Sequence, residues 1–161
     1  MKRALILFGL LPACIVVTEG NSDQDTVTVD GEVTELSFDL GAGDLTVRVA
    51  DVETTEVHRT FHWTGDHPDA LVALDGGVLY LDVDCDNRPF GYCSVDHEVL
   101  VPAGIDVYGI TGAGDVTLVA TGGVVDVETG AGDVDVDGAT QVTALSAPRM
   151  IALLMSTAMP K

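Results

Sequence analysis

The stretch Thr111–Asp137 reads TGAGDVTLVATGGVVDVETGAGDVDVD and contains the phrase TGAGDV twice, the second copy 18 residues after the first. A third copy, GAGDLTV, lies upstream at Gly41–Val47. When the three copies are aligned, Asp44, Asp115 and Asp133 coincide. A repeat of this length, written in valine, threonine and glycine, is typical of short β-strands that stack as successive coils.

The composition of the whole chain also favours strands over helices. Its 161 residues suffice for one domain, and 18 glycines supply turns between segments rich in valine and threonine. Between Asn21 and the C-terminal tail, no long segment repeats its apolar residues at helical spacing. We therefore predict an all-β fold: either a β-solenoid (β-helix-like) or a two-sheet β-repeat domain, with coils of about 18 residues.

The net charge is −19, from 26 acidic and 7 basic residues. Such a surface repels the phosphate backbones of nucleic acids and the headgroups of anionic lipids, so we expect neither as an electrostatic partner. Two interpretations of the charge remain. It is either an acidic coat that keeps the protein soluble, or a surface that binds cations.

The N-terminus has the pattern of an export signal. Residues 1–13 combine a short basic start with an apolar run that is too short to span a membrane. The stretch Leu11-Pro12-Ala13-Cys14 resembles a bacterial lipobox, which predicts lipidation of Cys14 and a lipid-anchored place in the cell envelope or on the outer surface. Ordinary cleavage after Ala13 and an unprocessed anchor are the alternatives. Residues 14–25 then form a tether.

Three histidines gather around one predicted strand. The segment Glu56–Trp63 alternates, which places its aromatic residues toward the core and His58 and His62 on the opposite face. With His67 close by, these imidazoles have a spacing that suits a metal ion. The alternative is a solvated strand face without a ligand.

Two cysteines enclose a short segment. Cys85 and Cys93 flank DNRPFGY, and in an exported protein this spacing predicts a disulfide. A metal or redox pair is the alternative, although no C-x-x-C motif supports it. The disulfide would leave Cys14 as the unpaired cysteine, in agreement with its lipidation.

The repeat domain is expected over residues 26–146, with coils at 111–128 and 129–146. No coil buries its apolar side without a neighbour, so we predict an inward ladder. Its members are Val116, Leu118, Val125, Val127, Val134 and Val136. Residues 147–161 are a divergent tail that lacks acids; they are interpreted as a helical cap over the last coil, or as the product of a shifted reading frame.

The chain resembles a known family. The segment CSVDHEVLVPAGIDVYGITGAGDVTL at Cys93–Leu118, followed by a second TGAGDVDV, is similar to the bacterial putative-adhesin family of unknown function, whose members carry β-strand repeats. The segment Trp63–Asp66 and the cysteine pair extend the resemblance to roughly residues 26–146. It implies a β-solenoid or two-sheet β-repeat domain at the cell surface, and it brings no catalytic residues.

The function favoured by these features is a non-catalytic cell-envelope lipoprotein with an adhesin-like domain. Its partners would be the membrane, through the lipid anchor, and a surface polysaccharide or protein. Hydrolase and metalloprotease motifs such as G-x-S-x-G and H-E-x-x-H are absent from the sequence. A carbohydrate-active β-helix enzyme with clustered acids is the catalytic alternative.

A calcium-binding repeat is the other alternative, and no other cofactor is expected. In calcium-binding β-rolls, glycines expose carbonyls and aspartates supply oxygens, but that motif recurs about every nine residues rather than 18. If the coils stack, Asp115 and Asp133 lie about 4.8 Å apart. They would then share a cation, or each would accept hydrogen bonds from the N–H groups of its own turn. The turn glycines are Gly41, Gly43, Gly112, Gly114, Gly130 and Gly132.

Overall fold

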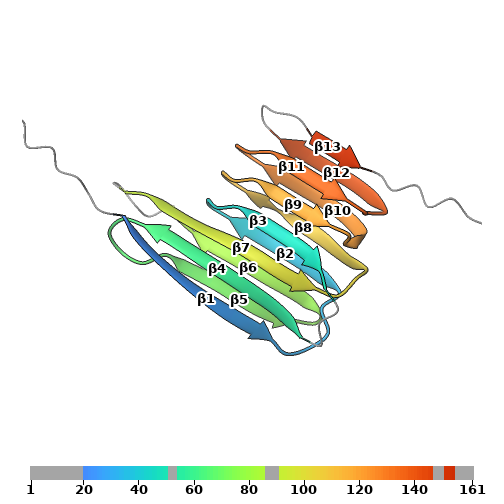
Figure 1. Cartoon of the computed structure of the whole chain (residues 1–161), viewed down its shortest axis with the longest axis horizontal. Coiled ribbons are helices and arrows are strands. Elements are labelled where there is room, and N and C mark those ends of the chain that lie inside the picture. The colour runs from blue at the N-terminus through green and yellow to red at the C-terminus, as the bar shows by residue number, and fades with distance from the viewer. Residues whose placement is uncertain (1–19, 51–53, 86–90, 147–150, 155–161) are drawn as a thin grey trace, which may run out of the picture.

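A computed structural model describes residues 20–50, 54–85 and 91–146, and the backbone of 151–154. The described residues form thirteen strands and no helix, arranged in two sheets (Figure 1). The strands are β1 (Asn21–Val29), β2 (Glu35–Leu40), β3 (Leu45–Val49), β4 (Thr55–Trp63), β5 (Asp69–Asp75), β6 (Val78–Asp84), β7 (Cys93–Val101), β8 (Ile105–Thr111), β9 (Val116–Val119), β10 (Gly122–Thr129), β11 (Val134–Asp137), β12 (Gln141–Ser146) and β13 (Ile151–Leu154).

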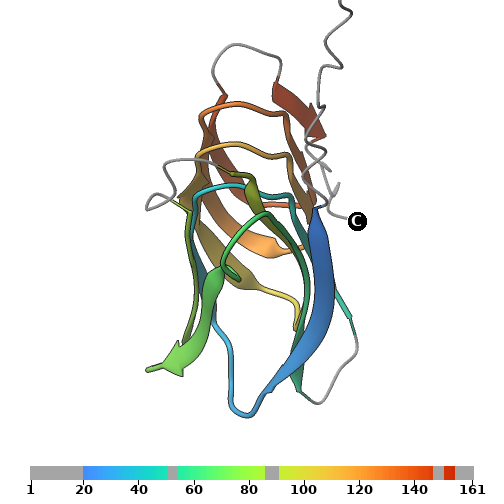
Figure 2. The same cartoon turned by 90° about the vertical axis from the view of Figure 1, so that its left-hand side faces the viewer.

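The two sheets face each other as layers (Figure 2). Sheet A has the order β1-β4-β7-β3-β9-β11-β13, and sheet B has the order β12-β10-β8-β2-β6-β5. Most neighbours are parallel, but β4 pairs antiparallel with both β1 and β7, and β5 pairs antiparallel with β6. Both sheets are therefore mixed and open. Of the two architectures that the sequence allowed, this is the two-sheet domain rather than a β-solenoid.

The 18-residue repeat sets the register of the parallel strands. From β6 onward, successive strands alternate between sheet B and sheet A. Val107 pairs with Val125 in sheet B, and Val116 pairs with Val134 in sheet A, so these steps are 18 residues. The last step in each sheet is 17 residues, because Val125 pairs with Val142 and Val134 pairs with Ile151. The pair β2–β3 is inserted between β6–β7 and β8–β9. The upstream copy of the phrase thus stacks directly on the first downstream copy.

The core lies between the layers and follows the predicted alternation. Val116 is fully buried, whereas Thr117, the next residue, is partly exposed. All six predicted ladder residues are buried: Val116, Leu118, Val125, Val127, Val134 and Val136. Burial of these side chains against their counterparts on adjacent coils supplies the main stabilisation of the parallel half.

The first strand begins earlier than the predicted tether allows. Residues 21–25 belong to β1, whose pairing with β4 runs from Asn21 opposite Trp63 to Val29 opposite Thr55. The polar side chains are tolerated because β1 is an edge strand and its hydrogen bonds come from the backbone. Arg59 on β4 adds an ion pair to Asp25 and donates to the Ala70 carbonyl of β5, which links the two sheets at this end.

The predictions of a disulfide and of a helical cap have different outcomes. The disulfide between Cys85 and Cys93 is confirmed, with 5.7 Å between the Cα atoms, and it joins the end of β6 to the start of β7. The helical cap is wrong for the described part of the tail, because Ile151–Leu154 forms strand β13 and pairs in parallel with β11. Cys14 and the export signal lie outside the described residues.

Candidate functional site: an aspartate file and the hollow beside it

The turns that carry the glycine phrases stack on one another where the chain crosses from sheet B to sheet A (Figure 2). They bond directly through their backbones: the Gly43 N–H donates to the Ala113 carbonyl, and the Gly114 N–H donates to the Ala131 carbonyl, each at 2.8 Å. The distance between turns is therefore that of a sheet, although the residues lie outside the strands.

This close approach explains the glycines. Gly114 and Gly132 have φ of +146° and +148°, and a Cβ there would lie 2.0 and 2.1 Å from the carbonyl oxygen of the preceding turn. Any side chain would collide with that backbone, so glycine is required for stacking. The other predicted turn glycines form the same two columns: Gly41, Gly112 and Gly130 in one, and Gly43 at the head of the other.

Four aspartates form a row beside the glycines, which we call the aspartate file: Asp96, Asp44, Asp115 and Asp133. Asp96 lies in β7, and the other three come directly before β3, β9 and β11 of sheet A. The Asp44 N–H donates to Asp96 Oδ1 at 3.0 Å, the Asp115 N–H donates to Asp44 Oδ1 at 2.9 Å, and the Asp133 N–H donates to Asp115 Oδ1 at 2.8 Å. The expected capping by its own turn is therefore wrong for Asp115, and for Asp133 it stays a prediction. The carboxylates of Asp96, Asp44 and Asp115 accept from the next coil, because the donor lies one strand spacing away.

The structure brings Asp115 and Asp133 together as predicted, but it gives them a hydrogen-bonding role. No group of three or more His, Cys, Asp or Glu side chains among the described residues has a metal-binding arrangement. Two carboxylates about 4.8 Å apart repel by roughly 0.9 kcal/mol in water. The N–H donors offset part of this repulsion, since a charged acceptor makes a stronger hydrogen bond than a neutral one.

Asp96 was missed as a member of the file. The segment Asp96-His97-Glu98-Val99 occupies in β7 the place that Asp44-Leu45-Thr46-Val47 occupies in β3. The shared pattern is an aspartate followed by two inward residues separated by one outward residue. The signal was hidden because the turn before Asp96 lacks the glycine phrase and because histidine replaces an aliphatic residue.

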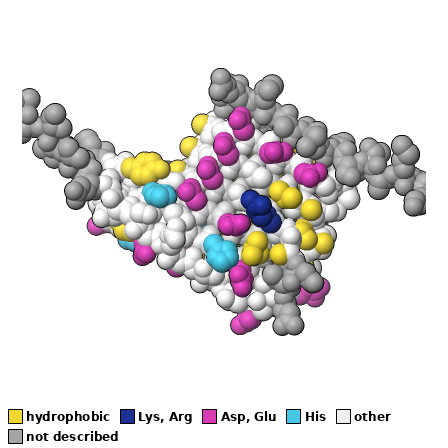
Figure 3. Space-filling view, in the orientation of Figure 1, with side chains coloured by type: hydrophobic (Ala, Val, Ile, Leu, Met, Phe, Trp, Pro, Cys, Tyr) yellow, Lys and Arg dark blue, Asp and Glu magenta, His cyan; other side chains and the backbone are white. Residues whose placement is uncertain are grey.

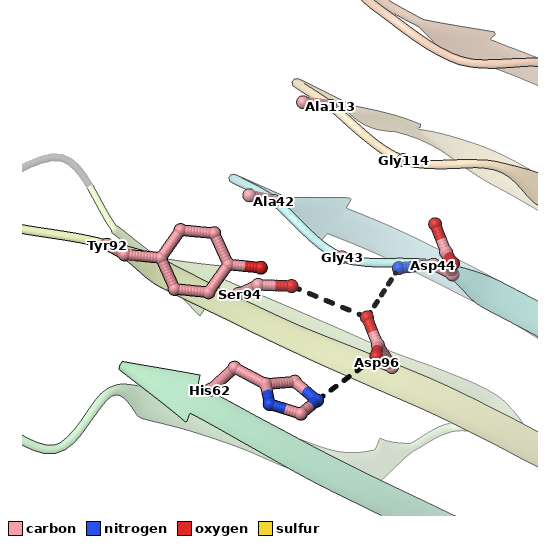
Figure 4. A pocket seen from close by; sticks show the side chains of 9 residues that line it. All are labelled: Ala42, Gly43, Asp44, His62, Tyr92, Ser94, Asp96, Ala113 and Gly114. Atoms are coloured by element: carbon pink, nitrogen blue, oxygen red, sulfur yellow. Dashed lines mark hydrogen bonds and ion pairs between the residues drawn. The ribbon is translucent and has the colours of Figure 1, made fainter. Parts of the chain in front are cut away.

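A hollow of about 430 Å³ lies at the Asp96 end of the file (Figure 4). Asp96 connects two of its polar side chains: Oδ1 also accepts from the Ser94 hydroxyl at 3.4 Å, and Oδ2 lies 3.6 Å from His62 Nε2. Tyr92 borders the hollow with 58% of its surface exposed. Backbone and Cβ atoms of the stacked turns, at Ala42 and Ala113, complete the lining.

The arrangement in this hollow is unsuited to nucleophilic catalysis. A catalytic triad places histidine between the serine and the carboxylate, so that the imidazole removes the hydroxyl proton. Here Asp96 lies between Ser94 and His62, and the serine donates to the carboxylate. The hollow offers an exposed aromatic ring and polar groups instead, a combination used for binding.

The three histidines predicted around β4 are kept apart. His58 bonds to the Thr26 hydroxyl at 2.9 Å and lies 3.3 Å from Glu56, whereas His62 is engaged with Asp96. His67 packs on the rings of Phe61 and Trp63. The three histidines therefore do not have the geometry of a metal site. His58 and His62 lie on a solvated strand face, which was the alternative interpretation.

His97 is an ionisable residue buried in the core. It is 2% exposed, its Nδ1 donates to the Val95 carbonyl at 3.0 Å, and its Nε2 has no hydrogen-bond partner among the described residues. Burial lowers the pKa of its imidazole from 6.5 to about 4, so the ring is neutral near pH 7. It takes the inward place that Leu45 holds on the neighbouring strand.

The chain shares its fold with a putative cell adhesion protein. That protein, from Clostridium sporogenes, is 14% identical, with 80% of this chain and 68% of that one covered and a TM-score of 0.55. A putative adhesin from Bacteroides fragilis is 14% identical over 83% of this chain and 68% of its own, with a TM-score of 0.46.

A third similar structure is a putative lipid binding protein from Parabacteroides distasonis, 12% identical over 78% of this chain and 61% of its own, with a TM-score of 0.36. At these identities the likeness concerns the fold. The Clostridium sporogenes protein is described as a putative cell adhesion protein, in agreement with the family resemblance of the sequence. No protein family matches the sequence itself, and no curated protein does.

Proposed function

We propose that this protein is an exported, non-catalytic binding protein of the bacterial cell surface, held in the envelope by a lipid on Cys14. The observation that carries the proposal is the fold shared with the Clostridium sporogenes protein. The hollow around Asp96 supports it, because its groups are arranged for contact rather than for proton transfer. The partner would be a surface polysaccharide or a protein.

The anchor would hold the domain close to the membrane. β1 begins at Asn21, seven residues after Cys14, and an extended chain spans at most about 3.6 Å per residue. The domain would therefore sit within about 25 Å of the lipid. Among the described residues there is no helix long and apolar enough to cross a membrane.

A calcium-binding role is the second candidate, favoured by the file of four carboxylates at successive strand positions. In the structure one oxygen of Asp96, Asp44 and Asp115 accepts an N–H, which leaves further acceptor capacity on each carboxylate. Calcium binds such oxygens in flexible arrangements. The stability measurement that opens the Discussion distinguishes this role from hydrogen bonding alone.

Mass spectrometry of the mature N-terminus tests the anchor. The full chain produced in a bacterium with a lipoprotein pathway should begin at Cys14 with a diacylglyceryl group, and Cys14→Ala should be released from the membrane fraction. Cys85→Ser in the same host is a control that leaves Cys14 in place. A mature protein that begins elsewhere, or retains Met1, contradicts the lipoprotein part of the proposal.

A further inference from the structure

The outer face of sheet B collects exposed apolar side chains. Among the described residues the exposed large hydrophobic side chains are Leu71 at 55%, Tyr80 at 41%, Ile110 at 49%, Leu145 at 59% and Tyr92 at 58%. Tyr92 lies at the hollow beside the aspartate file, whereas the other four project from strands of sheet B. Acidic side chains lie between them in the register, Asp82 and Asp39 between Leu71 and Ile110, and Glu128 between Ile110 and Leu145, so the face is apolar and acidic at once.

The strand register places these side chains in two rows across the sheet. In the first row Ser37 on β2 lies between Tyr80 on β6 and Tyr108 on β8. The two tyrosines are thus two strands apart, about 10 Å. In the second row Asp39 lies between Asp82 and Ile110, and Leu71 pairs with Asp82.

A shallow hollow of about 580 Å³ adjoins Tyr80 on this face. Leu71, Ala73 and Tyr80 supply its apolar wall, and Asp39, Asp75 and Asp82 supply carboxylates around it. A ligand seated here meets an aromatic ring, an aliphatic side chain and negative charges at once.

The charge on sheet B has a single sign. Its six strands contain nine acidic residues and no Lys, Arg or His: Glu35, Asp39, Asp69, Asp75, Asp82, Asp84, Asp106, Asp126 and Glu128. The basic residues of the described strands, Arg48 and Arg59, lie on sheet A with His58 and His62. Figure 3 shows such basic and histidine side chains among the acids on the face toward the viewer.

The tyrosines lie within the field of these carboxylates. Partial loss of hydration, followed by the charges of Asp106, Glu35 and Asp126, raises the pKa of the Tyr108 phenol. The phenol therefore stays neutral. A neutral ring bordered by carboxylates attracts a cation through its face and through the adjacent charges.

We propose that the outer face of sheet B binds a basic polypeptide segment whose Lys or Arg side chains lie over Tyr80 and Tyr108 while its aliphatic side chains contact Leu71 and Ile110. This inference rests on the proposed binding function and names the chemistry of its partner. Charge complementarity selects this occupant. A second copy of this chain, at a net charge of −19, is repelled, and so is an anionic lipid surface.

The experiment measures binding of a fluorescent peptide of alternating arginine and valine to the purified full chain by anisotropy. Tyr80→Ala and Tyr108→Ala should each weaken binding roughly twofold to fivefold, as expected for loss of one exposed cation–π contact. Tyr80→Phe should keep the affinity, because the ring remains. Thr117→Ala is the control: it shortens a partly exposed side chain on the outer face of sheet A and should leave binding unchanged.

Two variants of this peptide separate the contribution of charge from that of apolar contact. Replacing arginine by glutamate should abolish binding, and replacing valine by serine should weaken it. Equal losses in Tyr80→Ala and Thr117→Ala would overturn the proposal, as would tighter binding of a neutral β-linked glucan at this face or self-association of the chain on it. Circular dichroism melting of each variant identifies any that fail to fold, and Tyr80→Phe then decides the outcome. Surface display in cells is measured separately, so its failure is distinguishable from failure here.

Discussion

Replacing Asp115 by asparagine probes the aspartate file most sharply. Asp115 has a carboxylate neighbour on each side, Asp44 and Asp133, and it both donates to the first and accepts from the second. Asparagine keeps an oxygen that accepts the Asp133 N–H and removes the charge. Alanine removes both, so the two variants separate repulsion from hydrogen bonding.

The magnitudes follow from the strand spacing. Each neighbour repels Asp115 by about 0.9 kcal/mol in water, and a Debye length of about 8 Å at physiological salt reduces the sum over both neighbours to about 1 kcal/mol. A neutral acceptor forms a hydrogen bond weaker by about 1 kcal/mol, so Asp115→Asn should be nearly neutral at that salt. At low salt it should be more stable than wild type by up to about 1 kcal/mol. Asp115→Ala should lie about 1 kcal/mol below Asp115→Asn.

Urea denaturation of the full chain at low and high salt, with calcium or chelator at matched ionic strength, measures these differences. Asp135→Asn is the control, because it removes an exposed charge from β11 that accepts no hydrogen bond from the described residues. Equal stabilities of Asp115→Asn and Asp115→Ala would refute the hydrogen-bonded file. A calcium-specific gain that disappears in Asp115→Asn would show that a shared cation holds the file together.

Three other changes test the core and the turns by the same denaturation assay. His97→Leu should flatten the pH dependence of the free energy of unfolding. Because the unfolded imidazole binds protons below about pH 6.5 and the folded one only near pH 4, wild type should lose about 2 kcal/mol of stability between about pH 7 and pH 5 that the variant keeps. An equal loss in both proteins would contradict this account of His97. Val116→Asp should cost more than about 3 kcal/mol and Thr117→Asp less than about 1 kcal/mol, and similar costs would mean that the register is wrong by one residue. Gly114→Ala should cost at least about 2 kcal/mol, because its Cβ would meet the Gly43 carbonyl; a neutral result would argue against the stacked turns.

The sequence predicted the parts of the fold that local pattern determines. Alternation along the repeats identified the inward face, and the 18-residue spacing matched the register of Val116 with Val134. The place of β2–β3 was not predictable, since nothing local indicates that Gly41–Val47 stacks between segments far along the chain. The start of β1 was predicted too far along the chain. Its polar side chains conceal an edge strand, because the pairing of that strand depends on its backbone.

The candidate site, like the fold, was predicted only in part from the sequence. Alignment of the phrases brought Asp44, Asp115 and Asp133 together, but the donor to each carboxylate lies on another coil and cannot be read from one segment. Asp96 lacked the glycine phrase that marked the others. The face of sheet B depends on strand order, so the row of Tyr80, Ser37 and Tyr108 is visible only after folding.

Staining of intact cells tests the proposed surface role most directly. An antibody raised against the purified chain is applied to bacteria that produce the full protein, before and after permeabilisation, with a cytoplasmic protein as the internal control. The account predicts strong staining of intact cells and its loss from the Cys14→Ala strain. Staining that is confined to permeabilised cells would contradict a binding protein displayed at the cell surface.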